Sequence, residues 1–302
     1  MTFLSVIIAA HNAEKTLAGV LHSLLDAIGS EAEQTEVIII NDNSVDSTQN
    51  IIEQWSARFP HFITRQVSYC NVGMVRNEGI QQSSGQYIFM LDSDDLLKPG
   101  SLQDAINFLR PHLPDMLITH LLEVRDLSKI TPEWGGFNPV SLTTDEAITR
   151  FLIHKDFQAH LGGQFIHREL FEKYPVPAIS CYEDFAVFPA MLATSRKIYF
   201  QRNGHYYYVK TGSSLSSDIT PDKIAHLVDC TLKMEEIFPD KFESLINCHW
   251  FDIFTNHWKH LTSSQREIVR KRVNKMYSWR FFMSKDVRFS YKKRVLKALW
   301  KK

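Results

Sequence analysis

Strand and helix patterns alternate along the first 120 residues of the chain. The residue pattern predicts strands at residues 3–9, 36–41, 62–68, 87–91 and 115–122, and the apolar runs within 36–41 and 87–91 indicate buried strands. Between these runs, apolar residues recur at a spacing of three and four. That spacing predicts helices at residues 17–28, 51–59, 74–82 and 101–109. The alternation is typical of βαβ units, so we expect an α/β fold with a mainly parallel central sheet.

The pattern is less regular in the middle of the chain. Thr143 and Glu146 resemble a capping box that opens a helix reaching about residue 154, and another helix is predicted at 184–193. Short strands are predicted at 165–166, 198–200 and 205–209, and the pattern is helical from Pro221 onward. A polar Gly/Ser stretch within residues 210–222 favours a boundary there. We therefore divide the chain into an α/β region, 1–215, and a helical C-terminal region, 216–302.

Three carboxylates follow the predicted strand at 87–91. Asp92, Asp94 and Asp95 are costly to hold close together unless a cation offsets their charge. Ligands of open α/β sheets bind at this end of the strands, and Mg²⁺ typically combines one or two carboxylates with substrate phosphates. A turn that only caps the next helix would explain one acid. The cluster therefore predicts a divalent cation that bridges the protein and a phosphorylated ligand.

Polar residues also follow the other predicted strands, and these strand ends should meet at one edge of the sheet. Each of them alone would also suit a loop. Together they predict a nucleotide pocket, in which an Asp accepts from a base or ribose and an Arg helps to neutralise a diphosphate. The residues are Ala9, His11 and Asn12 after the first strand, Asp42 after the second, and Gly73 and Arg76 after the third.

Four blocks of the sequence resemble the inverting family 2 glycosyltransferases, in the order and spacing of that family. They are Ser-Val-Ile-Ile-Ala-Ala-His-Asn at 5–12, Glu-Val-Ile-Ile-Ile-Asn-Asp-Asn-Ser-Val-Asp-Ser-Thr at 36–48, Asn-Val-Gly-Met-Val-Arg-Asn-Glu-Gly at 71–79 and Gly-Gln-Tyr-Ile-Phe-Met-Leu-Asp-Ser-Asp-Asp at 85–95. The resemblance covers about residues 3–215. It implies a GT-A fold and a nucleotide-sugar donor, usually a UDP-sugar.

The resemblance also implies roles for single residues. Asp92, Ser93 and Asp94 would form the family's Asp-x-Asp motif, with Asp92 near the donor ribose or sugar and Asp94 on Mn²⁺ or Mg²⁺. Asp42 matches the position that contacts the base. His11 stands where the family often has an aromatic residue, and Ala9 where it often has Pro. His205 stands where some relatives place a metal ligand.

Glu183 and Asp184 resemble the family's Glu-Asp pair. The implied reaction needs a base that takes the proton of the acceptor hydroxyl, and a carboxylate on the side opposite the leaving diphosphate can do this. We predict that Asp184 is this base and that Glu183 is its neighbour or binds the acceptor. Asp184 would also suit a helix N-cap, and the two roles can coexist.

The formal net charge of zero hides an asymmetry. Residues 266–302 carry 14 Lys or Arg and 2 Asp or Glu, a net charge of +12, and the rest of the chain carries −12. Aromatic residues lie among these cations, which suits an anionic membrane surface or nucleic acid; a solvated helical face packed on the main region is the third interpretation. No apolar run is long enough to span a bilayer. We expect a cytoplasmic protein, in peripheral contact with the inner membrane face and without a nucleic-acid partner.

The resulting hypothesis is a metal-dependent inverting glycosyltransferase. It would move a hexose or N-acetylhexosamine from a UDP-sugar to an oligosaccharide or lipid-linked acceptor of a cell-surface glycan, such as capsule or lipopolysaccharide. One alternative is a non-catalytic nucleotide-sugar or glycan-binding module, which the presence of Asp94 and Asp184 disfavours. The other is a sugar-nucleotidyltransferase, which would need a basic Gly-rich loop that residues 9–20 lack. The sequence predicts neither the identity of the sugar nor the oligomeric state.

Overall fold

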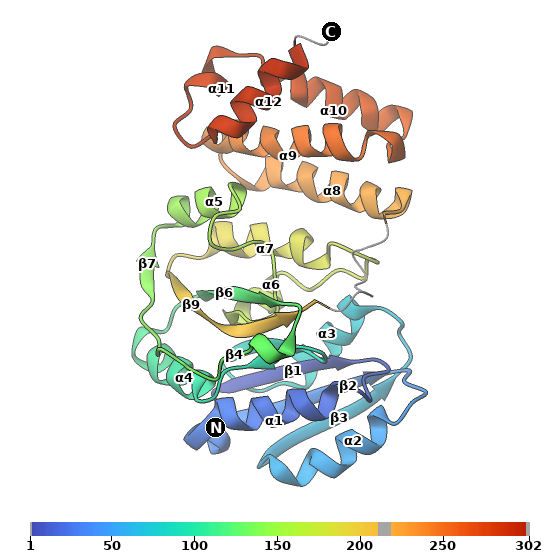
Figure 1. The fold of residues 1–302 in the computed structure, drawn as a ribbon, viewed down its shortest axis with the longest axis vertical. Helices are drawn as coiled ribbons and strands as arrows, with labels where there is room; N and C mark the ends of the chain where they lie inside the picture. The colour runs from blue at the N-terminus through green and yellow to red at the C-terminus, as the bar shows by residue number, and fades with distance from the viewer. Residues whose placement is uncertain (1, 211–218, 300–302) are drawn as a thin grey trace.

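The computed structural model describes residues 2–210 and 219–299 (Figure 1). Within these residues one sheet contains the strands β1 (Leu4–Ala10), β2 (Thr35–Asp42), β3 (His61–Val67), β4 (Tyr87–Asp92), β5 (Leu96–Leu97), β6 (Met116–Val124), β7 (Val140–Leu142), β8 (Phe165–His167) and β9 (Ile198–Val209). The strand order is β3-β2-β1-β4-β8-β6-β9-β5, with β7 paired to β9. The first four predicted strands are confirmed, and each predicted end lies within one residue of the observed end.

Helices cover both faces of the sheet. They are α1 (Leu17–Ile28), α2 (Thr48–Trp55), α3 (Val72–Gln82), α4 (Ser101–His112), α5 (Thr144–Leu152), α6 (Arg168–Lys173) and α7 (Glu183–Thr194). Side chains alternate along β1, so Val6 and Ile8 join the core under α1 and α4, while Ile7 joins the core under α3, α5 and α7. The capping box of Thr143 and Glu146 is present at the start of α5.

The sheet is parallel from β3 to β4 and mixed beyond it. β8 is antiparallel to both of its neighbours, β4 and β6, and β5 and β7 are antiparallel to β9. The expected parallel pairing is therefore present among the first four strands and again between β6 and β9, while β8, β5 and β7 make the rest of the sheet antiparallel. The change occurs where Gly163, with a φ of 76°, turns the chain into β8 and donates its N–H to Met90. The two short strands predicted near the end of the sheet are one strand, β9, with a register shift opposite β6.

The C-terminal region is helical, as predicted. It contains α8 (Pro221–Ile237), α9 (Glu243–Asn256), α10 (Ser263–Lys275), α11 (Trp279–Met283) and α12 (Phe289–Leu299). These helices lie at one end of the long axis of the molecule (Figure 1). Their apolar residues, such as Trp250 and Val269, belong to the same core as one face of the sheet. The predicted boundary falls largely on residues 211–218, outside the described residues. None of the described helices has the length and apolar character needed to cross a bilayer.

Candidate active site

The carboxyl ends of three neighbouring strands meet at one edge of the sheet. Ala9 of β1 is in register with Ile40 of β2 and with Asp92 of β4. The structure therefore brings the loop that begins at His11, the end of β2 at Asp42 and the acidic turn after β4 to the same edge. This is the arrangement that the order of strands and motifs predicted.

The loop after β1 is bonded to the loop after β2. His11 donates from Nδ1 to the carbonyl of Asp42 at 2.6 Å, and its Nε2 accepts from the side-chain amide of Asn12 at 3.0 Å. Asn12, in the left-handed region with a φ of 47°, accepts from the N–H of Val45 at 2.9 Å and donates its own N–H to Ser44. Both His11 and Asn12 are exposed. Their side chains are thus fixed and open to solvent at the strand edge.

Asp42 organises the turn that leads into α3. Its carboxylate accepts from the N–H groups of Tyr69 at 2.7 Å, Cys70 at 3.1 Å and Asn71 at 3.3 Å, and the residue is 6% exposed. Sequence reasoning missed this role, because the three donors are backbone groups of a distant loop. A carboxylate has about four acceptor positions, so one remains for a ligand.

Helix α3 is fastened to the segment that precedes α7. Asn71 caps α3 by accepting from Met74 and also donates to the carbonyl of Ile179, while Asn77 exchanges two hydrogen bonds with the backbone of Val176. A Cβ on Gly73 would lie 2.3 Å from the carbonyl oxygen of Pro177, so only glycine allows this close approach. Gly73 was predicted to bind the donor, and the structure gives it this packing role.

Arg76 joins three acids from three parts of the chain. Its guanidinium, 7% exposed, lies 3.3 Å from Asp92, 2.9 Å from Glu183 and 2.6 Å from Asp184. The sequence predicted that Arg76 would neutralise a diphosphate. In the structure its guanidinium is instead bonded to carboxylates, and it holds the end of β4 against the start of α7.

The charges of this cluster shift the pKa values of its members. Burial alone would lower the pKa of Arg76, but the attraction of Asp184, Asp92 and Glu183 outweighs it and raises that pKa far above its usual value. Burial, followed by the charge of Asp184, raises the pKa of Glu183. One cation therefore faces three carboxylates, and Glu183 is the member on which the surplus negative charge is costly.

Asp184 is fixed by two groups. Its Oδ1 accepts from Arg76, and its Oδ2 accepts from the N–H of Leu161 at 3.0 Å. The N-cap of α7 is Tyr182, with a φ of 68°, and Asp184 lies in the first turn of the helix. The side chain of Asp184 is 18% exposed, so solvent or a substrate hydroxyl can reach it.

The acids after β4 separate into two kinds. Asp95 is fully buried and accepts from the N–H of Val209 at 2.7 Å; burial, followed by the charge of Asp92, raises its pKa to about 8. Asp95 thus ties the turn to the end of β9, a structural role. Burial and the charge of Asp92 also raise the pKa of Asp94. Thr16 donates to the carbonyl of Ser93 at 2.7 Å, which fixes the turn from the other side.

Tyr206 supports the same turn. Its hydroxyl accepts from the N–H of Asp92 at 3.1 Å, and burial raises the pKa of this phenol well above its usual value. Sequence reasoning missed Tyr206, since it lies more than a hundred residues from Asp92 and belongs to no motif.

A divalent cation fits the chemistry of Asp92 and Asp94. Both supply the carboxylate oxygens that Mg²⁺ and Mn²⁺ prefer, and the raised pKa of Asp94 marks negative charge that is not offset. Among the described residues, no group of three His, Cys, Asp or Glu side chains is placed to hold a metal. The two aspartates would therefore have to share the cation with phosphate oxygens of a ligand, as Mg²⁺ sites often do.

His205 does not belong to this site, contrary to the expectation that it binds metal. It is fully buried, and its ring packs on Phe89, Phe137, Phe165 and Trp134 at centroid distances of 5.5 to 6.1 Å. Neither ring nitrogen has a hydrogen-bond partner among the described residues. Burial, and then the charge of Lys98, lowers the pKa of His205 to about 3. It is a neutral ring in an aromatic core.

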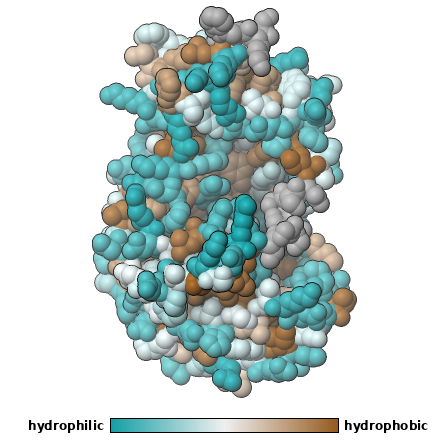
Figure 2. All heavy atoms as spheres, in the orientation of Figure 1, coloured by the Kyte–Doolittle hydropathy of each residue, from teal (hydrophilic) through white to brown (hydrophobic). Residues whose placement is uncertain are grey.

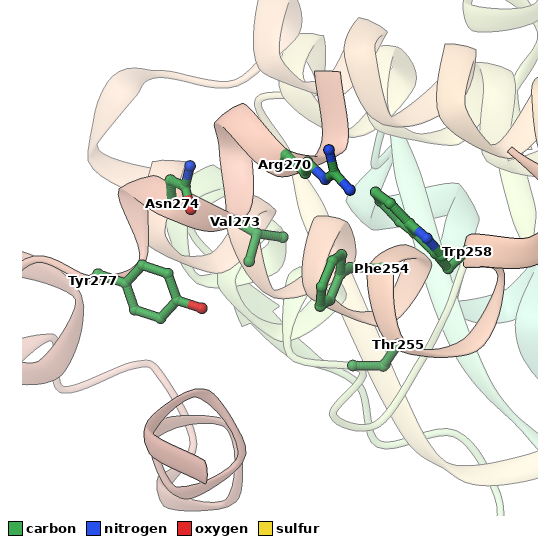
Figure 3. Close-up of a pocket in the computed structure, with 7 residues that line it drawn as sticks. All are labelled: Phe254, Thr255, Trp258, Arg270, Val273, Asn274 and Tyr277. Carbon is green, nitrogen blue, oxygen red and sulfur yellow. The ribbon is translucent and has the colours of Figure 1, made fainter. Parts of the chain in front are cut away.

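A separate cavity of about 500 Å³ lies in the C-terminal region (Figure 3). Phe254 and Trp258 point toward it from α9 and the residues just after it. Arg270 and Val273 of α10, and Tyr277 just after α10, point toward it from the other side. Arg270 lies 4.9 Å from the centroid of the Trp258 ring. No carboxylate lines this cavity. It therefore lacks the groups of the cluster around Arg76.

Residues 5–174, more than half of the chain, match the model of the family described as Glycosyl transferase family 2. The chain belongs to this family. The matches to individual relatives have low sequence identity but are longer than the stretch 5–174. The poly(ribitol-phosphate) beta-N-acetylglucosaminyltransferase TarS of Staphylococcus aureus is 25% identical over 220 residues, which cover 70% of this chain and 37% of TarS. The poly(ribitol-phosphate) beta-glucosyltransferase of Bacillus spizizenii is 28% identical over 224 residues, 72% of this chain and 34% of that enzyme. The chain thus matches about a third of the length of these relatives.

Solved structures show the same fold. The crystal structure of S. aureus TarS 1–349 in complex with UDP-GlcNAc has a TM-score of 0.70 and 18% identity, covering 91% of this chain and 80% of that one. The mannosyltransferase PcManGT from Pyrobaculum calidifontis, in complex with GDP-Man and Mn²⁺, has a TM-score of 0.61 and 12% identity, covering 98% of this chain and 79% of that one. The predicted GT-A fold with a helical C-terminal region is confirmed.

Proposed function

We propose that this family 2 protein is an inverting glycosyltransferase. It transfers a hexose or N-acetylhexosamine from a UDP-sugar to a hydroxyl of a cell-surface glycan of the teichoic-acid kind. The observation that carries the proposal is the single guanidinium of Arg76, which holds Asp92, at the strand edge, and Asp184, at the start of α7, in one cluster. An acid at the donor edge and a base for the acceptor are the two parts that such a transfer needs.

The donor and acceptor are inferred from relatives. TarS has been crystallised with UDP-GlcNAc, and two similar enzymes are named for their action on poly(ribitol-phosphate). A further relative is named as a minor teichoic acid biosynthesis protein of Bacillus subtilis. In this chain, His11 and Asn12 are exposed at the edge where the nucleotide would lie, and the carboxylate of Asp42 beside them keeps one acceptor position.

Asp184 would act as the general base. The acceptor oxygen forms a bond to the anomeric carbon while the bond from that carbon to the diphosphate breaks, and the bonding electrons leave with UDP. The hydroxyl proton passes to the carboxylate of Asp184. Attack from the side opposite the leaving group inverts the anomeric centre. Arg76 and the N–H of Leu161 hold the base in place, so little reorientation is needed when the acceptor binds.

Asp92 and Asp94 would hold Mn²⁺ or Mg²⁺ together with the donor diphosphate. The cation would offset negative charge on the leaving UDP as a Lewis acid. Without the cation, burial and repulsion from Asp92 disfavour the charged form of Asp94 and raise its pKa. Donor binding should therefore depend on the divalent ion, and chelation with EDTA should weaken it.

The proposal is tested by incubating the protein with a panel of UDP-sugars, Mn²⁺ and ribitol-phosphate or oligosaccharide acceptors. The release of UDP and the transfer of sugar are then measured. Asp184→Asn should bind the donor nearly as tightly as the wild type and lower transfer by about two orders of magnitude or more. Asp94→Asn should lose metal-dependent donor binding. The control is Asp145→Asn, which removes an exposed carboxylate on α5 that pairs with Lys241 and should leave both readouts unchanged.

Two outcomes would contradict the proposal. Normal turnover by Asp184→Asn would exclude this residue as the base. Binding of a UDP-sugar without turnover across the whole acceptor panel would instead favour a nucleotide-sugar-binding module. The configuration of the product, determined by nuclear magnetic resonance, tests inversion separately.

A further inference from the structure

The C-terminal end of the molecule exposes large apolar side chains. Trp279 and Phe289 are each 78% exposed, Met283 is 58% exposed and Leu296 is 46% exposed. These four residues lie on α11 and α12, which form the end of the long axis (Figure 1). Figure 2 shows brown, apolar side chains at the surface of this end. We call these four residues, together with Lys285, Lys293 and Lys297, the terminal face.

The terminal face belongs to packed helices. Phe281, Val287 and Val295 are at most 3% exposed and anchor α11, the following loop and α12 in the core. On α12, Phe289, Lys293, Leu296 and Lys297 are spaced so that they share one side of the helix. Tyr291, which donates to Asp252 of α9, is on the inner side. The apolar residues of the terminal face therefore remain outside although their helices are docked.

The cations of the C-terminal region are of two kinds. Arg272 pairs with Glu235, Lys275 with Glu243 and Arg294 with Asp252. By contrast, Lys285, Lys293 and Lys297 are exposed, and none of them has an ion pair with any residue of the described ranges. The paired cations hold the helices together, which leaves the three lysines of the terminal face available for an external anion.

We propose that the terminal face docks on the surface of an anionic lipid bilayer. Tryptophan and phenylalanine reach the boundary between headgroups and acyl chains, and lysines beside them attract acidic headgroups. This binding goes beyond sugar transfer, because it uses none of the residues of the catalytic edge. It would bring the enzyme to lipid-linked acceptors at a membrane.

Charge argues against a second copy of the chain as the occupant. In a twofold dimer the same patch meets itself, so the three lysines of each copy would face one another. An anionic bilayer offers the complementary charge and an apolar layer beneath it. The four exposed apolar side chains have no such complement on nucleic acid, whose outer surface is phosphate.

Flotation with vesicles tests the proposal. The full chain should float with vesicles of equal parts phosphatidylglycerol and phosphatidylcholine, and much less with phosphatidylcholine alone or in high salt. The variant Lys285→Glu, Lys293→Glu, Lys297→Glu should bind about a hundredfold more weakly, since each Lys near an anionic leaflet contributes about fivefold. The variant Trp279→Ser, Phe289→Ser should bind at least about tenfold more weakly, and should lose the blue shift of tryptophan fluorescence on vesicle binding.

Matched variants elsewhere on the surface serve as controls. Lys155→Glu, Lys197→Glu changes two exposed lysines outside the terminal face, and Leu127→Ser removes an apolar side chain that is 58% exposed. These controls should float like the wild type. Circular dichroism and sugar transfer to a soluble acceptor should be unchanged in all variants. Two results would overturn the proposal. One is equal flotation of the terminal-face variants and the wild type. The other is a wild-type chain that does not bind vesicles but forms a dimer that the terminal-face variants lose.

Discussion

Two regions of this molecule use the same ionic groups in opposite ways. Around Arg76, three carboxylates from β4 and α7 meet one guanidinium that is 7% exposed. In the C-terminal helices the ion pairs lie nearer solvent, as in the pair of Lys275 and Glu243, which are 51% and 36% exposed. Burial makes the first cluster rigid and expensive to break, whereas water competes with the second. The catalytic edge therefore depends on a cluster whose central guanidinium cannot be removed without a large loss of stability.

Replacement of the central cation should have the largest effect. Arg76→Met removes a buried guanidinium and leaves Asp92, Glu183 and Asp184, which are 37%, 15% and 18% exposed, without a counter-charge, so the free energy of unfolding should fall by about 3–5 kcal/mol. Urea denaturation measures this loss. Arg76→Lys keeps the charge but not the fork of donors, and should lie between Met and the wild type. A loss below about 1 kcal/mol for Arg76→Met would place this cluster in the same class as the surface pairs.

His205 tests burial without any partner. His205→Phe replaces a ring whose nitrogens have no partner in the described residues, and the free energy of unfolding should rise by about 1–2 kcal/mol near neutral pH. The pKa of His205 is about 3 in the fold and near 6.5 in the unfolded chain, so protons stabilise the unfolded state as the pH falls below 6.5. The advantage of the variant should therefore grow by about 2 kcal/mol by about pH 5.

The same variant separates the two roles considered for His205. Metal-dependent donor binding by His205→Phe should equal that of the wild type. A loss of metal dependence in a folded variant would restore His205 as a ligand.

Removal of one surplus charge should have a smaller effect. Glu183→Gln keeps an acceptor for Arg76 and removes the carboxylate whose pKa is raised by burial and by Asp184. A raised pKa means that ionisation of Glu183 costs stability as the pH rises above about 4.5, its unfolded value. The variant should therefore equal the wild type in stability at about pH 4 and exceed it slightly, by about 1 kcal/mol or less, at about pH 8. Chemical denaturation at both pH values is the measurement, and a stability loss at about pH 8 would contradict the surplus-charge interpretation.

The surface pairs should matter least. Lys275→Met should change the free energy of unfolding by about 0.5 kcal/mol or less. Arg272→Met should cost about 1 kcal/mol, since Arg272 and Glu235 are 22% and 24% exposed and Trp250 also bonds to Glu235. Thermal denaturation at low and high salt distinguishes them from the Arg76 cluster, because only exposed pairs are strongly screened.

The sequence predicts the strand edge better than the cluster beneath it. β1, β2 and β4 are built around continuous apolar runs, and each is followed by its own polar motif, so both the strands and the convergence of His11, Asp42 and Asp92 could be inferred. The three partners of Arg76 are 16, 107 and 108 residues away, and nothing in the sequence next to Arg76 marks them. The roles of Asp95 and Tyr206 escaped for the same reason. The mixed part of the sheet depends on one turn at Gly163 and on a strand, β8, that is three residues long.

The hydrogen bonds of Asp42 link the two halves of the proposed reaction. Asp42 fixes the turn from which α3 begins, α3 is fastened to the segment before α7, and Arg76 reaches from α3 to Asp184. One chain of hydrogen bonds thus connects the site that would bind the nucleobase with the group that would deprotonate the acceptor. We therefore expect an Asp42 substitution to disturb the proton transfer as well as the affinity for the donor.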